Sequence, residues 1–406
     1  MHDAAGGWAL ERCIACGAGV FAAEYWGRAP LLTRAAQLGG GFGDLLDADA
    51  VDELVSARGL RTPFARMAKD GEVLATARFT RGGGAGATIN DQLADDKVLA
   101  LVADGATLVL QGLHRTWPPL VRFATALSDE LGHPVQVNAY VTPPQNRGFA
   151  PHYDVHDVFV MQVAGHKHWT IHEPVVRDPL ADDPWENHRA DVTARATQTP
   201  LIDTVLAPGD ALYLPRGTIH SATALGETSI HLTVGIHPLT RHHLLRHLLD
   251  EAKHRTDLRA ALPMGTDLAD PAVLAPHLAA TADALRAALD DIDTASVARR
   301  VGTSLQRSTR GEPIGPLAQL AAAEALDETS TLRLRAGLRP SVRFDGNDLV
   351  ISMLDRDLRL PAAMHDAVKT LLAGGTFVVS ELPGLDVHEQ VDLARRLLRE
   401  GVLVPA

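Results

Sequence analysis

The hydrophobic pattern of the chain changes twice along its length. From about residue 36 to 240, short apolar runs alternate with Gly, Pro and Asp, which is the pattern of a β-sandwich or barrel. The runs that we predict as strands are 106–110, 135–141, 158–163, 168–172, 211–214 and 229–236. From about 241 to 325, apolar residues recur at spacings of three and four, which predicts helices that form either a lid or an oligomerisation surface.

The two ends of the chain have different patterns. Residues 1–35 read as a helical lead-in to the β-rich region. The last stretch predicts strands at 332–338 and 348–353 and helices at 362–372 and 388–400, which fits a small winged-helix-like domain. A chain of 406 residues fits two or three domains. We therefore expect an α+β protein with domains at 1–240, 241–325 and 326–406.

The charge and composition exclude some classes of function. A net charge of −12 disfavours direct nucleic-acid binding, and the ten basic and ten acidic residues after position 330 argue against a DNA-reading wing. No segment approaches the ~18 apolar residues of a membrane span. The start of the chain also lacks a signal-peptide pattern. We expect a cytoplasmic protein that does not bind membranes.

The only two cysteines, Cys13 and Cys16, form a C-x-x-C in an apolar, helix-like opening. A zinc site needs four ligands, and a redox motif needs a preceding strand, and neither is visible. Buried helix packing is the favoured interpretation, with redox or metal chemistry as the alternative.

The segment GFAPHYD at 148–154 carries the first part of a candidate metal site. Residues two apart in an extended strand point to the same face, so His152 and Asp154 present an imidazole and a carboxylate side by side. A third ligand must come from a neighbouring strand, and His220 follows a Pro-Gly-Asp turn, a short apolar strand and a Pro-Arg-Gly turn. Two histidines and a carboxylate leave three open metal positions, which suits non-haem Fe(II) oxygenases.

An Fe(II) oxygenase that uses 2-oxoglutarate also needs a cation to bind the far carboxylate of this cosubstrate. A candidate lies close to the metal motif in the sequence. The runs 158–164 and 168–172 look like a hairpin that turns at Gly165-His166, with Lys167 at the turn. Only five of the 406 residues are lysines, so a lysine here is informative. A single ammonium can bind a carboxylate as a point charge.

Two longer segments resemble a known family. Residues 138–174, NAYVTPPQNRGFAPHYDVHDVFVMQVAGHKHWTIHEP, and 214–222, LPRGTIHSA, resemble the ribosomal oxygenases of the JmjC, or cupin-like, superfamily. The resemblance implies a double-stranded β-helix (jelly-roll) core, a helical dimerisation domain and a C-terminal winged helix. It implies Fe(II) ligation by His152, Asp154 and His220, and O2 and 2-oxoglutarate as cosubstrates.

The same resemblance assigns further residues. Lys167 matches the anchor of the 2-oxoglutarate C5 carboxylate, Tyr140 and Thr233 match supporting hydroxyls, and Asn138 matches a polar position lining the site. For Tyr140 and Asn138, ordinary strand packing stays open as an alternative. Val155, His156 and Ser221 depart from the family's residues near the mouth of the site.

The resemblance implies hydroxylation of a ribosomal protein, at histidine in preference to arginine, by a homodimeric enzyme. Two alternatives remain open. One keeps the chemistry and changes the substrate to a peptide or a small biosynthetic intermediate. The other is a non-catalytic cupin-type binding protein, which the complete ligand set with Lys167 disfavours.

Three further features of the sequence are not expected to take part in catalysis or binding. The segment 81–88, RGGGAGAT, lacks the Gly-Lys-Ser/Thr ending of a P-loop and is expected to be a loop near the mouth of the site. His166, His168 and His172 are expected to be exposed or packing histidines, with a second metal site as the alternative. His242, His243 and His247 are expected on a solvated helix face.

Overall fold

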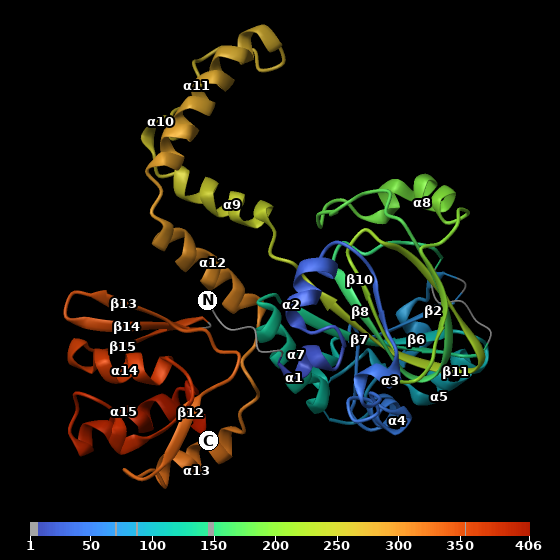
Figure 1. The fold of residues 1–406 in the computed structure, drawn as a ribbon, viewed down its shortest axis with the longest axis horizontal. Coiled ribbons are helices and arrows are strands. Elements are labelled where there is room, and N and C mark those ends of the chain that lie inside the picture. Colours follow the sequence, from blue (N-terminus) through green and yellow to red (C-terminus); the bar gives the residue numbers. More distant parts are fainter. Residues whose placement is uncertain (1–6, 70, 87, 145–149, 354) are drawn as a thin grey trace. The chain divides into compact units, whose positions relative to one another are not determined.

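A computed structural model describes residues 7–69, 71–86, 88–144, 150–353 and 355–406 (Figure 1). Gly148 and Phe149 of the GFAPHYD segment, and Ala87 of the glycine-rich loop, lie outside these described residues. The chain divides into two compact units, Met1–Pro238 and Leu239–Ala406. Within the described residues, every helix is too short or too polar to cross a membrane. The subdivision of the second unit near residue 325 stays a prediction.

A nine-stranded sheet forms the centre of the first unit, so the α+β class with a β-sheet core is confirmed. Its strands are β1 (Leu31–Thr33), β2 (Ala65–Lys69), β3 (Glu72–Val73), β6 (Thr107–Leu110), β7 (Val135–Thr142), β8 (Asp157–His172), β9 (Ile202–Leu206), β10 (Ala211–Leu214) and β11 (Ile219–Ile236). The order is β1-β10-β8-β11-β7-β6-β2-β3, and β9 pairs with β8. A separate hairpin joins β4 (Thr80–Arg81) to β5 (Gln92–Leu93).

Helices cover one face of this sheet. They are α1 (Trp8–Glu11), α2 (Ala18–Val20), α3 (Ala35–Leu38), α4 (Ala48–Ser56), α5 (Asp95–Ala103), α6 (Leu113–Thr116) and α7 (Pro118–Leu131). The helix α8 (Arg189–Arg195) stands apart from them (Figure 1) and packs with Tyr153 and Ile219. Alternation along β8 sends Phe159 and Met161 into the core shared with α4 and α7. Val158 and Val160 point the other way and pack with Leu212 and Ile171.

The predicted hairpin at Gly165-His166 is wrong, because β8 continues as one strand through this point. Gly165 has φ +63°, and a Cβ there would lie 2.3 Å from the Thr228 carbonyl oxygen, so glycine is required for the bend. The first half of β8 pairs with β10, the second half pairs with β9, and β11 runs beside both. The Gln162 amide donates to the carbonyl oxygens of Ala164 and Gly165 and thereby stabilises the bend. The strand β11 pairs with both halves of β8. It therefore begins at Ile219, ten residues before the predicted start at 229.

The second unit begins with helices and ends in a mixed α/β region. The helices are α9 (Arg241–Ala252), α10 (Thr256–Arg259), α11 (Pro271–Asp290), α12 (Thr294–Ser308) and α13 (Pro316–Glu324). The rest comprises β12 (Thr331–Leu334), β13 (Ser341–Asp345), β14 (Asp348–Met353), β15 (Arg356–Pro361), α14 (His365–Leu372), β16 (Thr376–Val378), α15 (Val387–Arg399) and β17 (Leu403–Pro405). These strands form two three-stranded sheets, β16-β12-β17 and β13-β14-β15.

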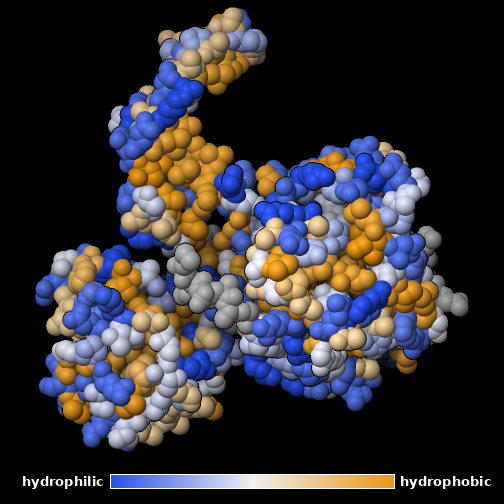
Figure 2. All heavy atoms as spheres, in the orientation of Figure 1, coloured by the Kyte–Doolittle hydropathy of each residue, from blue (hydrophilic) through white to orange (hydrophobic). Residues whose placement is uncertain are grey.

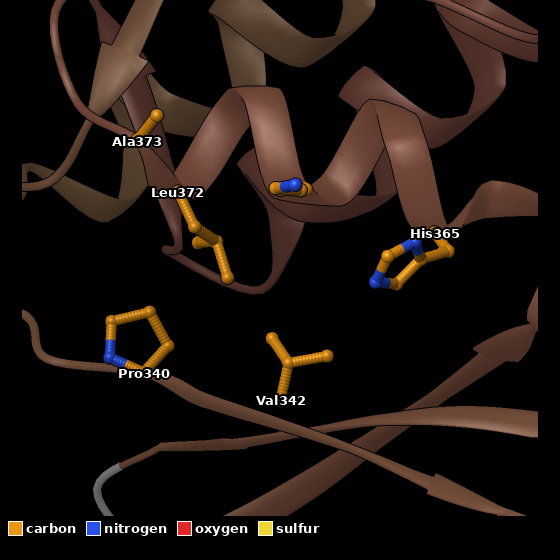
Figure 3. Close-up of a pocket in the computed structure, with 6 residues that line it drawn as sticks. Pro340, Val342, His365, Leu372 and Ala373 are labelled. Atoms are coloured by element: carbon orange, nitrogen blue, oxygen red, sulfur yellow. The ribbon is translucent and has the colours of Figure 1, made fainter.

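Two surface features of this unit stand out. Leu244, Leu245, Leu249 and Leu278 on α9 and α11 are each between 45 and 58% exposed, and hydrophobic side chains gather over these helices in Figure 2. A cavity of about 370 Å³ lies between β13 and α14 (Figure 3). Its walls are mostly apolar, with Lys369 and His365 as the charged or titratable groups.

The two cysteines lie in the turn between α1 and α2 rather than inside a helix. Cys13 is buried, and burial raises the pKa of its thiol far above the ordinary value. Both cysteines are free. The buried, protonated Cys13 thiol is a packing group, as expected, but Cys16 is only half-buried and neither cysteine packs in a helix, so that part of the prediction is wrong.

Candidate metal centre

The three predicted metal ligands meet in the structure. His152 and Asp154 precede β8, and His220 is the second residue of β11. The backbones of His152 and His220 form an isolated antiparallel bridge, with N–H···O distances of 3.2 and 2.8 Å. This bridge places the two imidazole centroids 4.5 Å apart. One ligand atom from each of the three residues lies within 4.8 Å of the others, and no other such group of three occurs in the part of the chain that the structure describes.

Backbone carbonyls fix the orientation of both imidazoles. Nδ1 of His152 lies 2.8 Å from the Ala150 carbonyl oxygen, and Nδ1 of His220 lies 3.0 Å from that of Thr218. A carbonyl only accepts hydrogen bonds, so each Nδ1 carries the proton and each Nε2 keeps a lone pair. Nε2 of His220 lies 3.8 Å from Oδ2 of Asp154. A hydrogen bond from Nδ1 to a backbone carbonyl is typical of histidines that bind a metal through Nε2.

The protonation states also suit a metal. Burial, together with the neighbouring His152, lowers the pKa of His220 to about 4, so its imidazole is neutral near pH 7. Burial raises the pKa of Asp154, but nearby histidines, with His156 the strongest, outweigh this effect and hold it below the ordinary value. A neutral imidazole and an ionised carboxylate are the forms that bind metal ions.

The three ligands open into a cavity of about 670 Å³. Lys167 lines it at 2% exposure, and its ammonium donates to the Thr142 hydroxyl at 3.2 Å. No carboxylate among the described residues forms an ion pair with this ammonium. Burial therefore lowers the pKa of Lys167 to about 7. A buried cation without an anionic partner, close to three metal ligands, is a candidate binding group for a carboxylate ligand.

Two of the three remaining predicted residues line this cavity. Tyr140 and Thr233 contribute to its wall, and the Tyr140 ring stacks on His231 with centroids 4.9 Å apart. Asn138 is not among the lining residues. Its Oδ1 accepts the Gly112 backbone N–H at 3.0 Å, which ties β7 to the start of α6.

Several residues that line the cavity were not predicted from the sequence. Arg66, Glu72 and Val73 come from the β2–β3 hairpin, whereas Trp185, Glu186 and Arg189 come from the segment that leads into α8. These segments are distant in sequence from the metal motif, and neither carries a local signal of a binding site. Trp169 and His231 could have been found, because each lies two residues from a predicted site residue on the same strand face.

The described residues of the glycine-rich loop, and the two histidine clusters noted in the sequence, are not among the residues that line the cavity. No described residue of the glycine-rich loop is among its lining residues, so the expected place of that loop at the mouth is not supported. His166 pairs with Glu227 and His168 pairs with Asp203, and both histidines are exposed, whereas His172 is buried. His243 caps the first turn of α9 at Thr240. These positions agree with the favoured interpretations.

Residues 115–244, which include all seven predicted site residues, match the family model of the JmjC domain. This part of the chain is therefore similar to a JmjC domain. Similar curated proteins include the bifunctional lysine-specific demethylase and histidyl-hydroxylase NO66 of Drosophila willistoni, 38% identical over 160 residues, which are 37% of this chain and 20% of the relative. Ribosomal oxygenase 1 of Rattus norvegicus is 39% identical over 118 residues, 29% of this chain and 19% of the relative. The chain thus matches about a fifth of the length of these relatives.

Solved structures share the fold over nearly the whole chain. The crystal structure of Escherichia coli ribosomal oxygenase YcfD covers 96% of this chain and 98% of its own, with a TM-score of 0.53 at 18% identity. YcfD in complex with cobalt and 2-oxoglutarate covers 95% and 97%, with a TM-score of 0.51 at 17% identity. The likeness therefore includes the regions on both sides of the JmjC domain.

Proposed function

We propose that this protein is an Fe(II)- and 2-oxoglutarate-dependent oxygenase that hydroxylates a protein side chain. One observation carries the proposal: three metal-ligand atoms and a buried ammonium without an anionic partner line the same cavity. The JmjC match and the YcfD complex with cobalt and 2-oxoglutarate support it.

The donor set fits Fe(II). His152, Asp154 and His220 would hold the ion through two imidazole nitrogens and a carboxylate oxygen, a set suited to non-haem iron. Iron in this site supplies the redox chemistry by which 2-oxoglutarate and O2 become succinate and CO2 while a substrate C–H becomes C–OH. The protein keeps both Nε2 atoms unprotonated through the carbonyls of Ala150 and Thr218.

The rest of the cavity binds and orients the cosubstrate. Lys167 neutralises the C5 carboxylate of 2-oxoglutarate, and Thr142 holds the ammonium in place. The hydroxyls of Tyr140 and Thr233 provide polar wall groups. Val158, Val160 and the Trp169 ring keep the remainder of this wall apolar and exclude water from the chain between the two carboxylates.

The substrate is a histidine, or an arginine, of a basic ribosomal protein, taken before its burial in rRNA. The names histidyl-hydroxylase and ribosomal oxygenase among the relatives support this choice. The net charge of −12 attracts basic partners and repels assembled RNA surfaces. Glu72 and Glu186 at the cavity have no ion-pair partner among the described residues, and both can bind a basic side chain.

The fold of the core and the division into domains are proposed by similarity to the ribosomal oxygenases. The two halves of β8 and β11, paired with β10, β7 and β9, form the double-stranded β-helix. Residues 241–325 form a helical dimerisation domain, which the exposed leucines of α9 and α11 support. Residues 326–406 form a winged-helix-like domain. The coverage of YcfD over its whole length supports this division.

The proposed function is tested by incubating the purified full chain with Fe(II), 2-oxoglutarate and histidine-containing peptides of basic ribosomal proteins. Succinate release and a peptide mass increase of one oxygen atom are expected, and both should be absent with Asp154→Ala. Peptides with histidine replaced by alanine identify the oxidised residue. Succinate release with a small metabolite and with no peptide would favour a biosynthetic enzyme, and no iron-dependent succinate release at all would favour a binding protein.

A further inference from the structure

Two buried polar groups in the cavity lack partners. The Trp169 indole nitrogen Nε1 and the His231 nitrogen Nδ1 are fully buried without a hydrogen bond, and the two side chains are 5% and 3% exposed. Neither side chain forms a hydrogen bond with any other described residue. Because buried polar groups in proteins are almost always paired, such orphans indicate that a ligand completes them.

The two residues lie between the cation and the metal ligands. The Trp169 ring centroid is 5.9 Å from the Lys167 ammonium and 6.1 Å from the His220 ring. His231 contacts the Trp169 ring edge-on at 5.5 Å and stacks on Tyr140. A ligand that chelates the metal and reaches Lys167 must therefore pass both side chains.

Both groups are neutral donors. An indole N–H carries no charge, and burial, with the neighbouring Lys167 and His220, lowers the pKa of His231 well below its ordinary value. The imidazole is thus uncharged and carries one N–H. A neutral donor can stand beside Lys167 without the repulsion that a second buried cation would cause.

A buried carboxylate needs more donors than one ammonium supplies. Each of its oxygens accepts up to two hydrogen bonds, and Lys167 already directs one donor to Thr142. We propose that the imidazole of His231 and the indole N–H of Trp169 hydrogen-bond the C5 carboxylate of 2-oxoglutarate beside Lys167. His231 is the principal donor, since its ring is held between Tyr140 and Trp169. The inference rests on the proposed function and adds two specificity-determining residues to it.

Calorimetric titration of the Mn(II)-loaded full chain without O2 tests the inference. Two ligands are compared: 2-oxoglutarate and 2-oxopentanoate, which keeps the chelating end and has no C5 carboxylate. His231→Phe preserves the stacked ring and removes both nitrogens, and Trp169→Phe removes the indole N–H. His168→Phe is the matched control, because His168 lies on the opposite face of β8 and pairs with exposed Asp203.

His231→Phe should weaken 2-oxoglutarate binding by about 10- to 100-fold, as expected for the loss of a hydrogen bond to a charged group. Its affinity for 2-oxopentanoate should match the parent. Trp169→Phe should show a smaller loss of the same kind, and His168→Phe should show none. His231→Gln, whose amide can donate, should recover part of the affinity and replaces His231→Phe if that variant does not fold.

Unchanged 2-oxoglutarate binding in His231→Phe would overturn the inference. An equal loss for both ligands would also overturn it, because a structural role predicts that outcome. If the parent itself binds no 2-oxoglutarate, the proposed function fails, and that result is distinct from either of these.

Discussion

Replacing Lys167 by methionine should stabilise the ligand-free protein and destroy its cosubstrate binding. In the structure the ammonium is 2% exposed, with one hydroxyl partner and no anionic partner among the described residues. Burial lowers its pKa from 10.5 to about 7. Since one pKa unit corresponds to about 1.4 kcal/mol, this burial destabilises the fold at pH 7 by on the order of 4 kcal/mol.

The sign of the pH dependence follows from the same shift. Between about pH 7 and pH 10.5 the unfolded chain holds the lysine proton and the folded chain does not, so the parent becomes more stable as pH rises. Methionine has no such titration. We expect Lys167→Met to raise the free energy of unfolding at pH 7 by about 2–4 kcal/mol and the advantage to vanish near pH 10.5.

Cosubstrate binding should change in the opposite direction. Removing one partner of a buried ion pair costs about 3–5 kcal/mol, so 2-oxoglutarate affinity should fall by roughly 10²- to 10³-fold or more. Denaturant unfolding and calorimetry with Mn(II) measure the two effects on the same samples. Lys69→Met is the control, because Lys69 forms a surface ion pair with Asp104 and should change both quantities little. A destabilised Lys167→Met variant that binds 2-oxoglutarate normally would show that Lys167 neither destabilises the ligand-free fold nor binds the cosubstrate.

Three further predictions concern the metal, the pH and the assembly. His152→Ala, Asp154→Ala or His220→Ala should abolish succinate release while the circular dichroism spectrum stays that of the parent, because a metal ligand contributes little to the packed sheet; one variant with parental turnover would disprove the triad. The apparent Kd for 2-oxoglutarate should be nearly constant below pH 7 and rise up to about tenfold per unit above it, because binding then requires proton uptake by Lys167; calorimetry in two buffers at pH 8 should detect that uptake, and its absence counts against Lys167 as the anchor. Light scattering should give a dimer, because leucines exposed along α9 and α11 form an apolar surface; a monomer at micromolar concentration, or a Leu245→Arg variant as dimeric as the parent, contradicts this assignment.

The sequence predicted the metal site because its chemistry is local. His152 and Asp154 share one short extended segment, and His220 follows turn residues that fix the start of β11. The structure brings all three together. Lys167 lines the same cavity, but the argument from the sequence was partly wrong, because it lies inside the bent strand β8 rather than at a hairpin turn. A glycine with positive φ marks both a turn and a bend, and only the pairing of β11 with both halves distinguishes them.

The rest of the site depends on tertiary contacts. Asn138 lies two residues from Tyr140 on the same face of β7, yet its side chain binds the Gly112 N–H instead of the cavity, a contact that no local pattern reveals. Arg66 and Trp185 reach the cavity from segments far from the motif in sequence. Such residues are placed by the packing of whole elements, so a single sequence carries no signal for them.

The proposed hydroxylase activity couples cosubstrate turnover to the insertion of oxygen into a peptide, and both can be measured in one reaction. The full chain is incubated with Fe(II), 2-oxoglutarate, a histidine-containing basic peptide and isotopically labelled O2. We expect one succinate for each peptide oxidised, one labelled oxygen atom in the histidine product, and neither with Asp154→Ala. A peptide that gains no labelled oxygen, in a preparation shown to bind Fe(II) and 2-oxoglutarate, would contradict the proposed protein hydroxylase.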